Sequence, residues 1–149
     1  MKEMSISATI ILVSKDRKSL ILQRNPGDSF PNKWTVPGGK LKDEDFDFSK
    51  SKDFCYYPAE YAAIREVKEE TGIEVKLGQL RLLCSMYMTP INRLVISFYA
   101  VLGRNSDEMK ISLSDNQAYS WIKREEIGNY DFIPDIGLEI EDTYKLIES

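Results

Sequence analysis

The sequence predicts an α/β fold that forms one domain over residues 1–149. Short segments rich in β-branched residues lie both before and after one strong helical segment, as expected for a sheet with packed helices. A chain of 149 residues is long enough to bury a sizeable core. No internal repeat or low-complexity linker divides it, so we expect no second domain.

The N-terminal part begins with patterns typical of strands. Residues 6–13 (ISATIILV) and 19–23 (SLILQ) are rich in apolar residues, and the polar residues between them predict a hairpin. Residues 33–36 predict a short strand. This strand leads into Pro37-Gly38-Gly39, which we interpret as a break where the backbone approaches a ligand closely.

Residues 58–71 (PAEYAAIREVKEET) form the strongest helical pattern. Pro58 suits the first turn of a helix, and Gly72 suits the position that follows its last residue. Residues 40–57, just before it, are rich in acidic and aromatic side chains and predict a loop. The rest of the chain predicts strands at 73–88, 93–102 and 117–122, a helical turn at 123–127 and an amphipathic helix at 136–147.

Composition excludes several classes of function. The net charge of −4 and pI of about 5.0 argue against binding to a nucleic-acid polymer, which needs clustered positive charge. No segment approaches the roughly 20 apolar residues of a membrane helix. The absence of histidine excludes Ser-His and Cys-His catalysis and histidine metal ligands. Cys55 and Cys84 match no zinc or disulfide pattern, so we expect a reducing, cytoplasmic location.

The predicted helix at 58–71 places three glutamates on one face. Residues three and four apart are helical neighbours, so Glu66, Glu69 and Glu70 project together. The like charges of Glu66 and Glu70 repel each other, and a divalent cation would turn this repulsion into ligation. A solvated glutamate face is the alternative interpretation, and the three glutamates alone do not decide between the two.

The neighbouring residues favour the metal interpretation. Residues 65–73 (REVKEETGI) are similar, position by position, to the core of the Nudix box, and Pro37-Gly38-Gly39-Lys40 is similar to its glycine-rich start. The order of strands also fits, so the chain resembles a Nudix (MutT-like) hydrolase over most of its length. The resemblance implies an α/β/α sandwich with a mixed β-sheet, and an enzyme that cleaves a diphosphate linkage with Mg²⁺ or possibly Mn²⁺.

The resemblance also implies roles for the residues of the box. Glu69 and Glu70 would be metal ligands, and Glu66 a ligand or the general base. The Gly38 carbonyl oxygen would be a further ligand, and Arg65 would orient the glutamates.

Three residues outside the helix are further candidates. Arg24 and Lys40 would bind substrate, although Arg24 at a strand end is equally typical of a surface charge. Asp115 lies six positions before Trp121, a spacing at which relatives place an acidic residue. It would be a metal ligand or base, or else an ordinary turn former.

The spacing inside the box departs from the family pattern. The interval between its second glycine and its arginine is residues 40–64, which is 12 residues longer than usual. Glu44 or Asp45 would replace the usual loop glutamate, or no residue does. The insertion of roughly residues 46–57 carries aromatic side chains that would stack on a base or form a lid, or would simply anchor the insertion to the core.

The expected partner is a small nucleotide substrate. A (deoxy)nucleoside triphosphate, hydrolysed to the monophosphate and pyrophosphate, is the first expectation. ADP-ribose, a nucleotide sugar and a dinucleoside polyphosphate are the alternatives, and a non-catalytic nucleotide sensor is a further one. A homodimer is compatible with the resemblance, but nothing in the sequence decides the oligomeric state.

Overall fold

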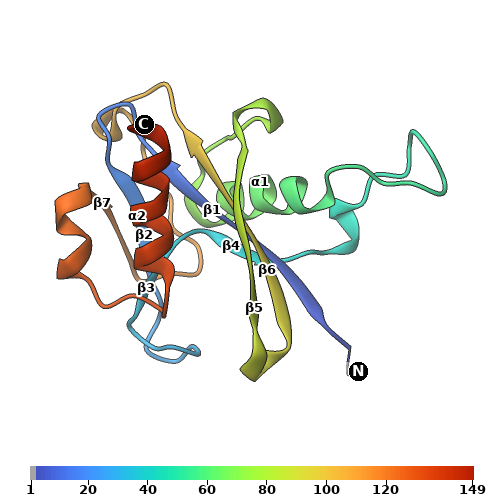
Figure 1. The fold of residues 1–149 in the computed structure, drawn as a ribbon, viewed down its shortest axis with the longest axis horizontal. Helices are drawn as coiled ribbons and strands as arrows, with labels where there is room; N and C mark the ends of the chain where they lie inside the picture. The colour runs from blue at the N-terminus through green and yellow to red at the C-terminus, as the bar shows by residue number, and fades with distance from the viewer. Residues whose placement is uncertain (1–2) are drawn as a thin grey trace.

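A mixed β-sheet of seven strands organises the molecule, whose computed structural model describes residues 3–149 (Figure 1). Its main path runs β3-β2-β1-β6-β5, while β4 pairs with β1 and β7 pairs with β2. The strands are β1 (Ser5–Val13), β2 (Ser19–Gln23), β3 (Trp34–Thr35), β4 (Gly38–Lys40), β5 (Arg81–Met88), β6 (Arg93–Val101) and β7 (Ala118–Ile122).

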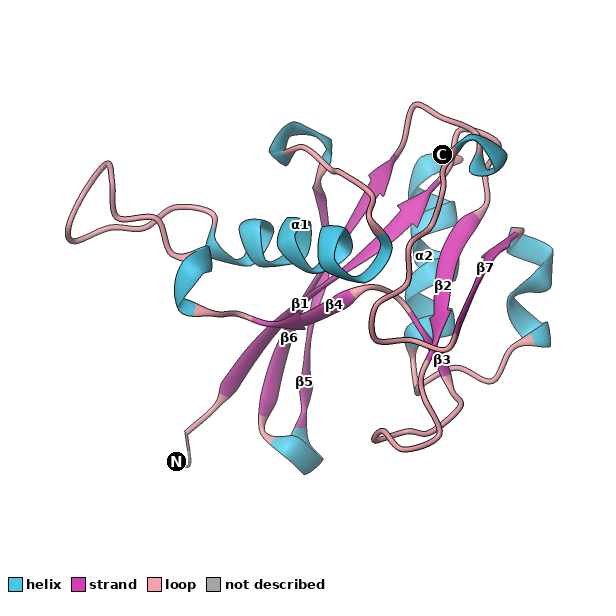
Figure 2. Ribbon diagram, turned by 180° about the vertical axis from the view of Figure 1, so that it is seen from behind, coloured by secondary structure: helices cyan, strands magenta, loops and turns pink. Residues whose placement is uncertain are grey.

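The two α-helices lie on opposite faces of this sheet, as comparison of Figure 1 with Figure 2 shows. They are α1 (Pro58–Thr71) and α2 (Ile136–Ile147). Short 3-10 helices occupy the connections: η1 (Asp43–Asp45), η2 (Leu77–Gln79), η3 (Thr89–Ile91), η4 (Ser106–Glu108) and η5 (Arg124–Asn129). The expected α/β/α sandwich with a mixed sheet is therefore confirmed.

The alternation of side chains along β1 separates two cores. Ala8, Ile10 and Leu12 point to one face, where they pack with Ala63 and Val67 of α1. Intervening residues point to the other face and pack with α2 in a second core of Ile11, Val13, Ile21, Val36, Ile122, Ile136, Ile140 and Tyr144. β1 lies at the centre because it pairs with β6 in parallel along its whole length and with β2 and β4 antiparallel.

The boundaries of both α-helices agree with the sequence pattern. Gly72 adopts a φ of 81° after α1, and its N–H donates to the carbonyl of Lys68 at 2.9 Å. This left-handed conformation suits glycine, which explains why the helix ends there. The helical turn predicted at 123–127 corresponds to η5.

One predicted strand and one predicted break between strands are wrong in detail. Residues 73–88 are not one strand, because only Arg81–Met88 pairs with β6. Ile73 and Val75 are buried in the core next to α1, so their apolar alternation reflects packing rather than strand pairing. The predicted break at the glycines is strand β4, in which Gly38 and Gly39 pair with Thr9 and Ala8 of β1.

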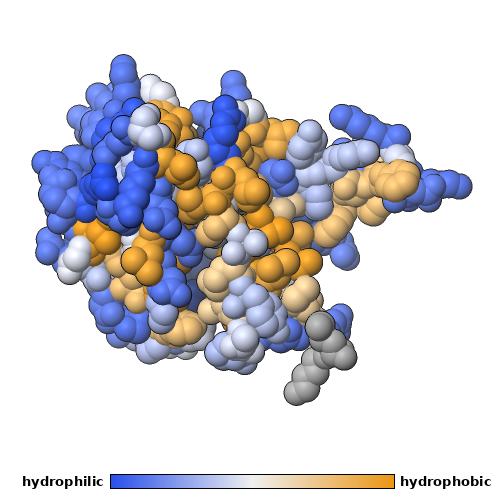
Figure 3. Space-filling view, in the orientation of Figure 1, coloured by the Kyte–Doolittle hydropathy of each residue, from blue (hydrophilic) through white to orange (hydrophobic). Residues whose placement is uncertain are grey.

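The insertion at residues 46–57 extends away from the body of the domain (Figures 1 and 3). Its aromatic side chains are exposed, with Phe54 and Tyr56 both at 68% relative exposure. The interpretation that these aromatics anchor the insertion to the core is therefore wrong. No helix within residues 3–149 is long and apolar enough to cross a membrane.

We predict that Tyr144→Phe destabilises the fold. The buried Tyr144 hydroxyl accepts from Ser19 Oγ at 3.0 Å and donates to the Arg17 carbonyl at 2.9 Å. Its removal leaves these groups without this partner, which costs about 1–3 kcal/mol of unfolding free energy. Urea unfolding measures the change. Tyr119→Phe, at an exposed tyrosine of β7, is the control, and an equal loss in both variants would contradict this account.

Candidate active site

The guanidinium of Arg65 connects α1 to the loop that precedes the insertion. Its Nε and Nη2 donate to Asp45 Oδ1 at 2.8 Å and Oδ2 at 2.9 Å. The side chains of Arg65 and Asp45 are only 13% and 2% exposed, so this two-pronged ion pair is buried. Glu44 lies at 3.8 Å from Arg65 Nε and is 63% exposed. Asp45, rather than Glu44, is therefore the loop acid that pairs closely with Arg65.

Arg65 also contacts two of the helix glutamates. Its Nη1 donates to Glu66 Oε1 at 2.8 Å and to Glu69 Oε2 at 3.2 Å, while Nη2 reaches the Lys40 carbonyl at 3.1 Å. One planar side chain thus fixes the positions of carboxylates from the loop and the helix. This geometry suits the orienting role expected of Arg65.

The surroundings of Asp45 keep it ionised. Burial alone would raise its pKa, but hydrogen bonds from Arg65 and from the backbone N–H of Lys42, together with the charge of Arg65, lower that pKa below its ordinary value. In turn the hydrogen bond to Asp45 raises the pKa of Arg65. These opposite shifts favour the charged form of both partners.

Glu66 and Glu70 form a contrasting pair of like acids. Burial raises the pKa of Glu70 to about 9, and the hydrogen bond and charge of Glu66 act in the same direction. Asp115 adds to this effect, whereas the backbone N–H of Gly38 opposes it. The three carboxyl groups are thus close enough to influence one another, and burial together with the charge of Glu66 favours the protonated form of Glu70.

The two glycines of β4 allow the sheet to approach these carboxylates. A Cβ atom built on Gly39 would lie 2.5 Å from Glu66 Oε1, and one built on Gly38 would lie 2.6 Å from the Ala8 carbonyl oxygen. A side chain at position 38 would collide with the backbone of β1, and one at position 39 would displace the carboxylate of Glu66. The glycines are therefore needed for close packing between β4, β1 and the face of α1 that carries Glu66.

The carboxylate oxygens of Glu66 and Glu70 are chemically suited to bind a hard divalent cation. Within residues 3–149 no three acidic or cysteine side chains form a ready-made metal cage. Glu66 and Glu70 nevertheless offer adjacent oxygens, and Mg²⁺ or Mn²⁺ favours oxygen ligands while keeping several sites for water and substrate. A cation would offset the repulsion between these two acids. Glu69 instead contacts Arg65 and is 48% exposed.

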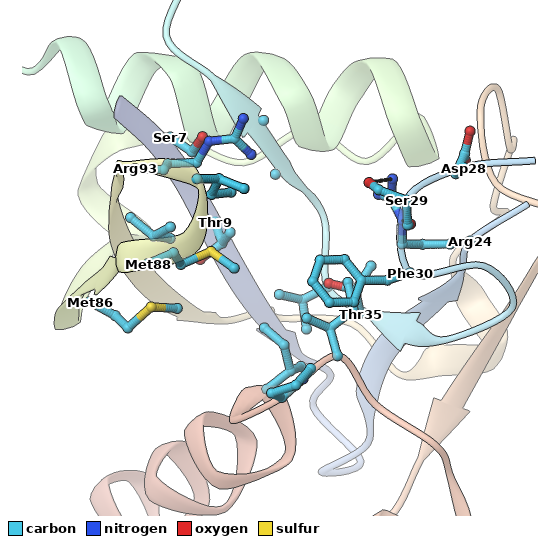
Figure 4. A pocket seen from close by; sticks show the side chains of 18 of the residues that line it. Ser7, Thr9, Arg24, Asp28, Ser29, Phe30, Thr35, Met86, Met88 and Arg93 are labelled. Atoms are coloured by element: carbon cyan, nitrogen blue, oxygen red, sulfur yellow. Dashed lines mark hydrogen bonds between the residues drawn. The ribbon is translucent and has the colours of Figure 1, made fainter. Parts of the chain in front are cut away.

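A pocket of about 530 Å³ opens beside the carboxylates. Its size suits a nucleotide-sized ligand. Gly38, Glu70 and Asp115 form part of its wall, and Arg24 lines it as well. Figure 4 shows the labelled side chains in two groups, one from β1, β5 and β6 and the other from β3 and the segment between β2 and β3.

The three candidates outside α1, which are Arg24, Lys40 and Asp115, differ in their position relative to the pocket. Arg24 lines the pocket and donates to the Ser29 carbonyl and hydroxyl, so it is more than a free surface charge. Asp115 also lines the pocket, and its backbone carbonyl accepts from Asn25. Lys40 is not among the lining residues. The insertion at 46–57 contributes no lining residue either, so the structure does not bring its aromatics to this pocket.

Several lining residues were not identified from the sequence. The largest are Phe30, Met86, Met88, Arg93 and Glu139. A weak signal existed, because Ser7 and Thr9 alternate with apolar residues of β1 and mark the pocket face as polar. Trp121 packs against the core next to α1, whereas Trp34 packs edge-on against Tyr130.

The fold, the glycine strand and the carboxylate helix agree with the family comparison. The family model for the NUDIX domain matches residues 4–140. The chain therefore belongs to the Nudix family, a family of pyrophosphohydrolases. No curated protein matches the sequence.

Solved structures share the fold at low sequence identity. A MutT/nudix family protein from Enterococcus faecalis has a TM-score of 0.74 at 17% identity, covering 100% of this chain and 64% of its own length. The NUDIX domain of Shewanella oneidensis NrtR, in complex with ADP ribose, has a TM-score of 0.75 at 17% identity. The match covers 99% of this chain and 90% of that domain's chain. A bifunctional NMN adenylyltransferase/ADP ribose pyrophosphatase from Francisella tularensis, in complex with AMP and Mn ion, has a TM-score of 0.68 at 21% identity. The match covers 99% of this chain and 42% of that longer chain.

We predict that Asp45→Asn lowers the unfolding free energy at neutral pH by about 3 kcal/mol, because it breaks a buried ion pair. Glu44→Gln, at the exposed neighbour, should cost less than about 1 kcal/mol.

The difference between wild type and Asp45→Asn should also depend on pH. Because the pKa of Asp45 is lowered in the folded state, its contribution is complete above the unfolded-state pKa of about 3.9. The contribution disappears as pH falls through the lower, folded-state pKa. Urea unfolding at several pH values measures this difference, and a gap that stays constant on acidification would contradict the assignment.

Proposed function

We propose that this protein is a metal-dependent hydrolase of a diphosphate linkage, acting on a (deoxy)nucleoside triphosphate to give the monophosphate and pyrophosphate. The observation that carries the proposal is the placement of Glu70, which lines a pocket of nucleotide size and whose carboxyl group contacts that of Glu66. In the overall reaction, water adds to one phosphorus of the linkage and the bridging oxygen leaves with the other phosphate.

The residues that would hold Mg²⁺ or Mn²⁺ are Glu66 and Glu70, with the Gly38 carbonyl, Glu69 and Asp115 as further candidates. Bound there, the cation would offset phosphate charge and lower the pKa of water. Glu66 is restrained by Arg65 at 2.8 Å and by the close approach of Gly39, so its carboxylate is positioned before substrate arrives. This restraint suits either a ligand or a general base.

The remaining residues orient the substrate. Arg24 lies at the opposite side of the pocket from the strand group in Figure 4, and its guanidinium is suited to a phosphate oxygen. Lys40 is exposed beside the carboxylates and remains a candidate for a more distant phosphate. Asp115 lines the pocket near Glu70 and is suited to a base or ligand.

ADP-ribose is the second candidate substrate. The NrtR domain that shares this fold was solved with ADP ribose, which supports the alternative without assigning that ligand to this chain. Nucleotide sugars and dinucleoside polyphosphates contain the same linkage. A hydrolysis panel with Mg²⁺ or Mn²⁺ separates these substrates by their products, and nucleotide binding without any cleavage would favour a non-catalytic sensor.

We predict that Glu70→Gln lowers Mg²⁺-dependent kcat/KM by at least roughly 100-fold, because it removes a charged oxygen ligand. The control is Glu74→Gln, at an exposed glutamate that pairs with Lys68 outside the pocket, and it should retain wild-type turnover. Near-normal turnover of Glu70→Gln would contradict the assignment of Glu70 as a metal ligand.

A further inference from the structure

The face of the sheet that carries the pocket is polar at one end. Along β1, Ile11 and Val13 are covered by α2, whereas Ser7 and Thr9 on the same face line the pocket. Thr9 Oγ1 lies 2.9 Å from Ser97 Oγ of β6, so hydroxyl groups continue across neighbouring strands. Because α2 covers only part of this face, the open part forms a floor with hydrogen-bonding groups.

Glu139 of α2 lies at the edge of this polar surface. It lies in the first turn of the helix, is 8% exposed and lines the pocket. Its Oε1 lies 3.8 Å from Cys84 Sγ, and Ser97 provides a side-chain hydrogen bond. Thiols and hydroxyls are weak partners for a carboxylate compared with a cation. Burial raises the pKa of Glu139, so a carboxyl group here is costly for the fold.

Ser7 gives an independent sign of a ligand. It is 5% exposed, and its hydroxyl has no hydrogen-bond partner within residues 3–149. Buried hydroxyl groups normally have a partner, because an unpaired one loses its hydration without compensation. Ser7 lines the same pocket as Glu139, so both polar groups are available to one bound molecule.

Apolar side chains flank these groups. Met86 and Met88 come from β5, and Phe30 comes from the segment between β2 and β3. Figure 4 shows the methionines and Phe30 on opposite sides of the cavity. Aromatic and thioether groups favour contact with a flat ring. The space between them therefore suits a planar base whose edge meets polar groups.

We propose that Glu139 and Ser7 recognise the nucleobase and make the pocket selective for a base that carries an exocyclic amino group, as adenine and guanine do. This inference rests on the proposed function, since the base belongs to the nucleotide whose phosphates reach Glu66 and Glu70. A carboxyl oxygen accepts from the N–H of an exocyclic amino group. Uracil presents its ring N–H between two carbonyl oxygens, which the Glu139 oxygens repel, and unsubstituted purine has no amino group.

Equilibrium binding of nucleoside monophosphates tests the inference without metal or turnover. Calorimetry with AMP, GMP, UMP and purine riboside 5′-monophosphate uses the full chain. Wild type should bind AMP or GMP at least about tenfold more tightly than the two ligands without an exocyclic amino group. Glu139→Met fills the space without an acceptor and should reduce this preference to about twofold or less. Glu139→Gln retains one carbonyl acceptor and should be intermediate.

Two further variants separate recognition from stability. Asp142→Asn is the matched control, because Asp142 lies on the same helix but is 63% exposed, and it should keep the wild-type preference. Ser7→Ala removes a hydroxyl without a protein partner, so it should weaken AMP or GMP binding several-fold while leaving the urea midpoint unchanged.

The outcomes distinguish this inference from the proposed function. An unchanged preference in Glu139→Met, or no binding of any monophosphate by wild type, overturns the recognition role even if triphosphates are hydrolysed. A preference that Glu139→Met abolishes supports the role even if no hydrolysis is detected.

Discussion

The guanidinium of Arg65 is the contact on which the arrangement of the site depends. It joins the loop acid Asp45, the glutamates of α1 and the backbone of β4 through one planar group. Without this positive charge, acids from two segments would repel one another at close range. The same contact closes the base of the insertion. Because loop-closure entropy rises slowly with length, 12 extra residues can extend from this point without disturbing the helix.

The sheet presents different chemistry on its two faces. On one face, β1 and β6 pack against α1 in a continuous apolar core, which fixes the helix and therefore the position of Glu66. On the other face, α2 covers only part of the surface, and the remaining floor is polar. The glycines of β4 lie where these two environments meet. The proposed sites of phosphate chemistry and base recognition therefore both lie next to β4.

The sequence predicted the features that depend on local rules. The helix at 58–71, its end at Gly72 and the clustering of glutamates all follow from helical periodicity and glycine conformation. The sequence alone did not distinguish Asp45 from Glu44, because burial decides between two adjacent acids. Glu139 was also missed, since nothing in a helical pattern shows which polar residue faces a pocket. Ile73 and Val75 misled the strand prediction because buried alternation also occurs without pairing.

Anomalous diffraction from crystals grown with Mn²⁺ and a non-hydrolysable nucleoside triphosphate analogue tests the central claim most directly. The account predicts manganese bound by the carboxylates of Glu66 and Glu70, with the phosphates in contact with it and the base between Met88 and Phe30. Manganese bound only at the acidic insertion, with no metal at Glu66 and Glu70 and the pocket empty, would contradict it.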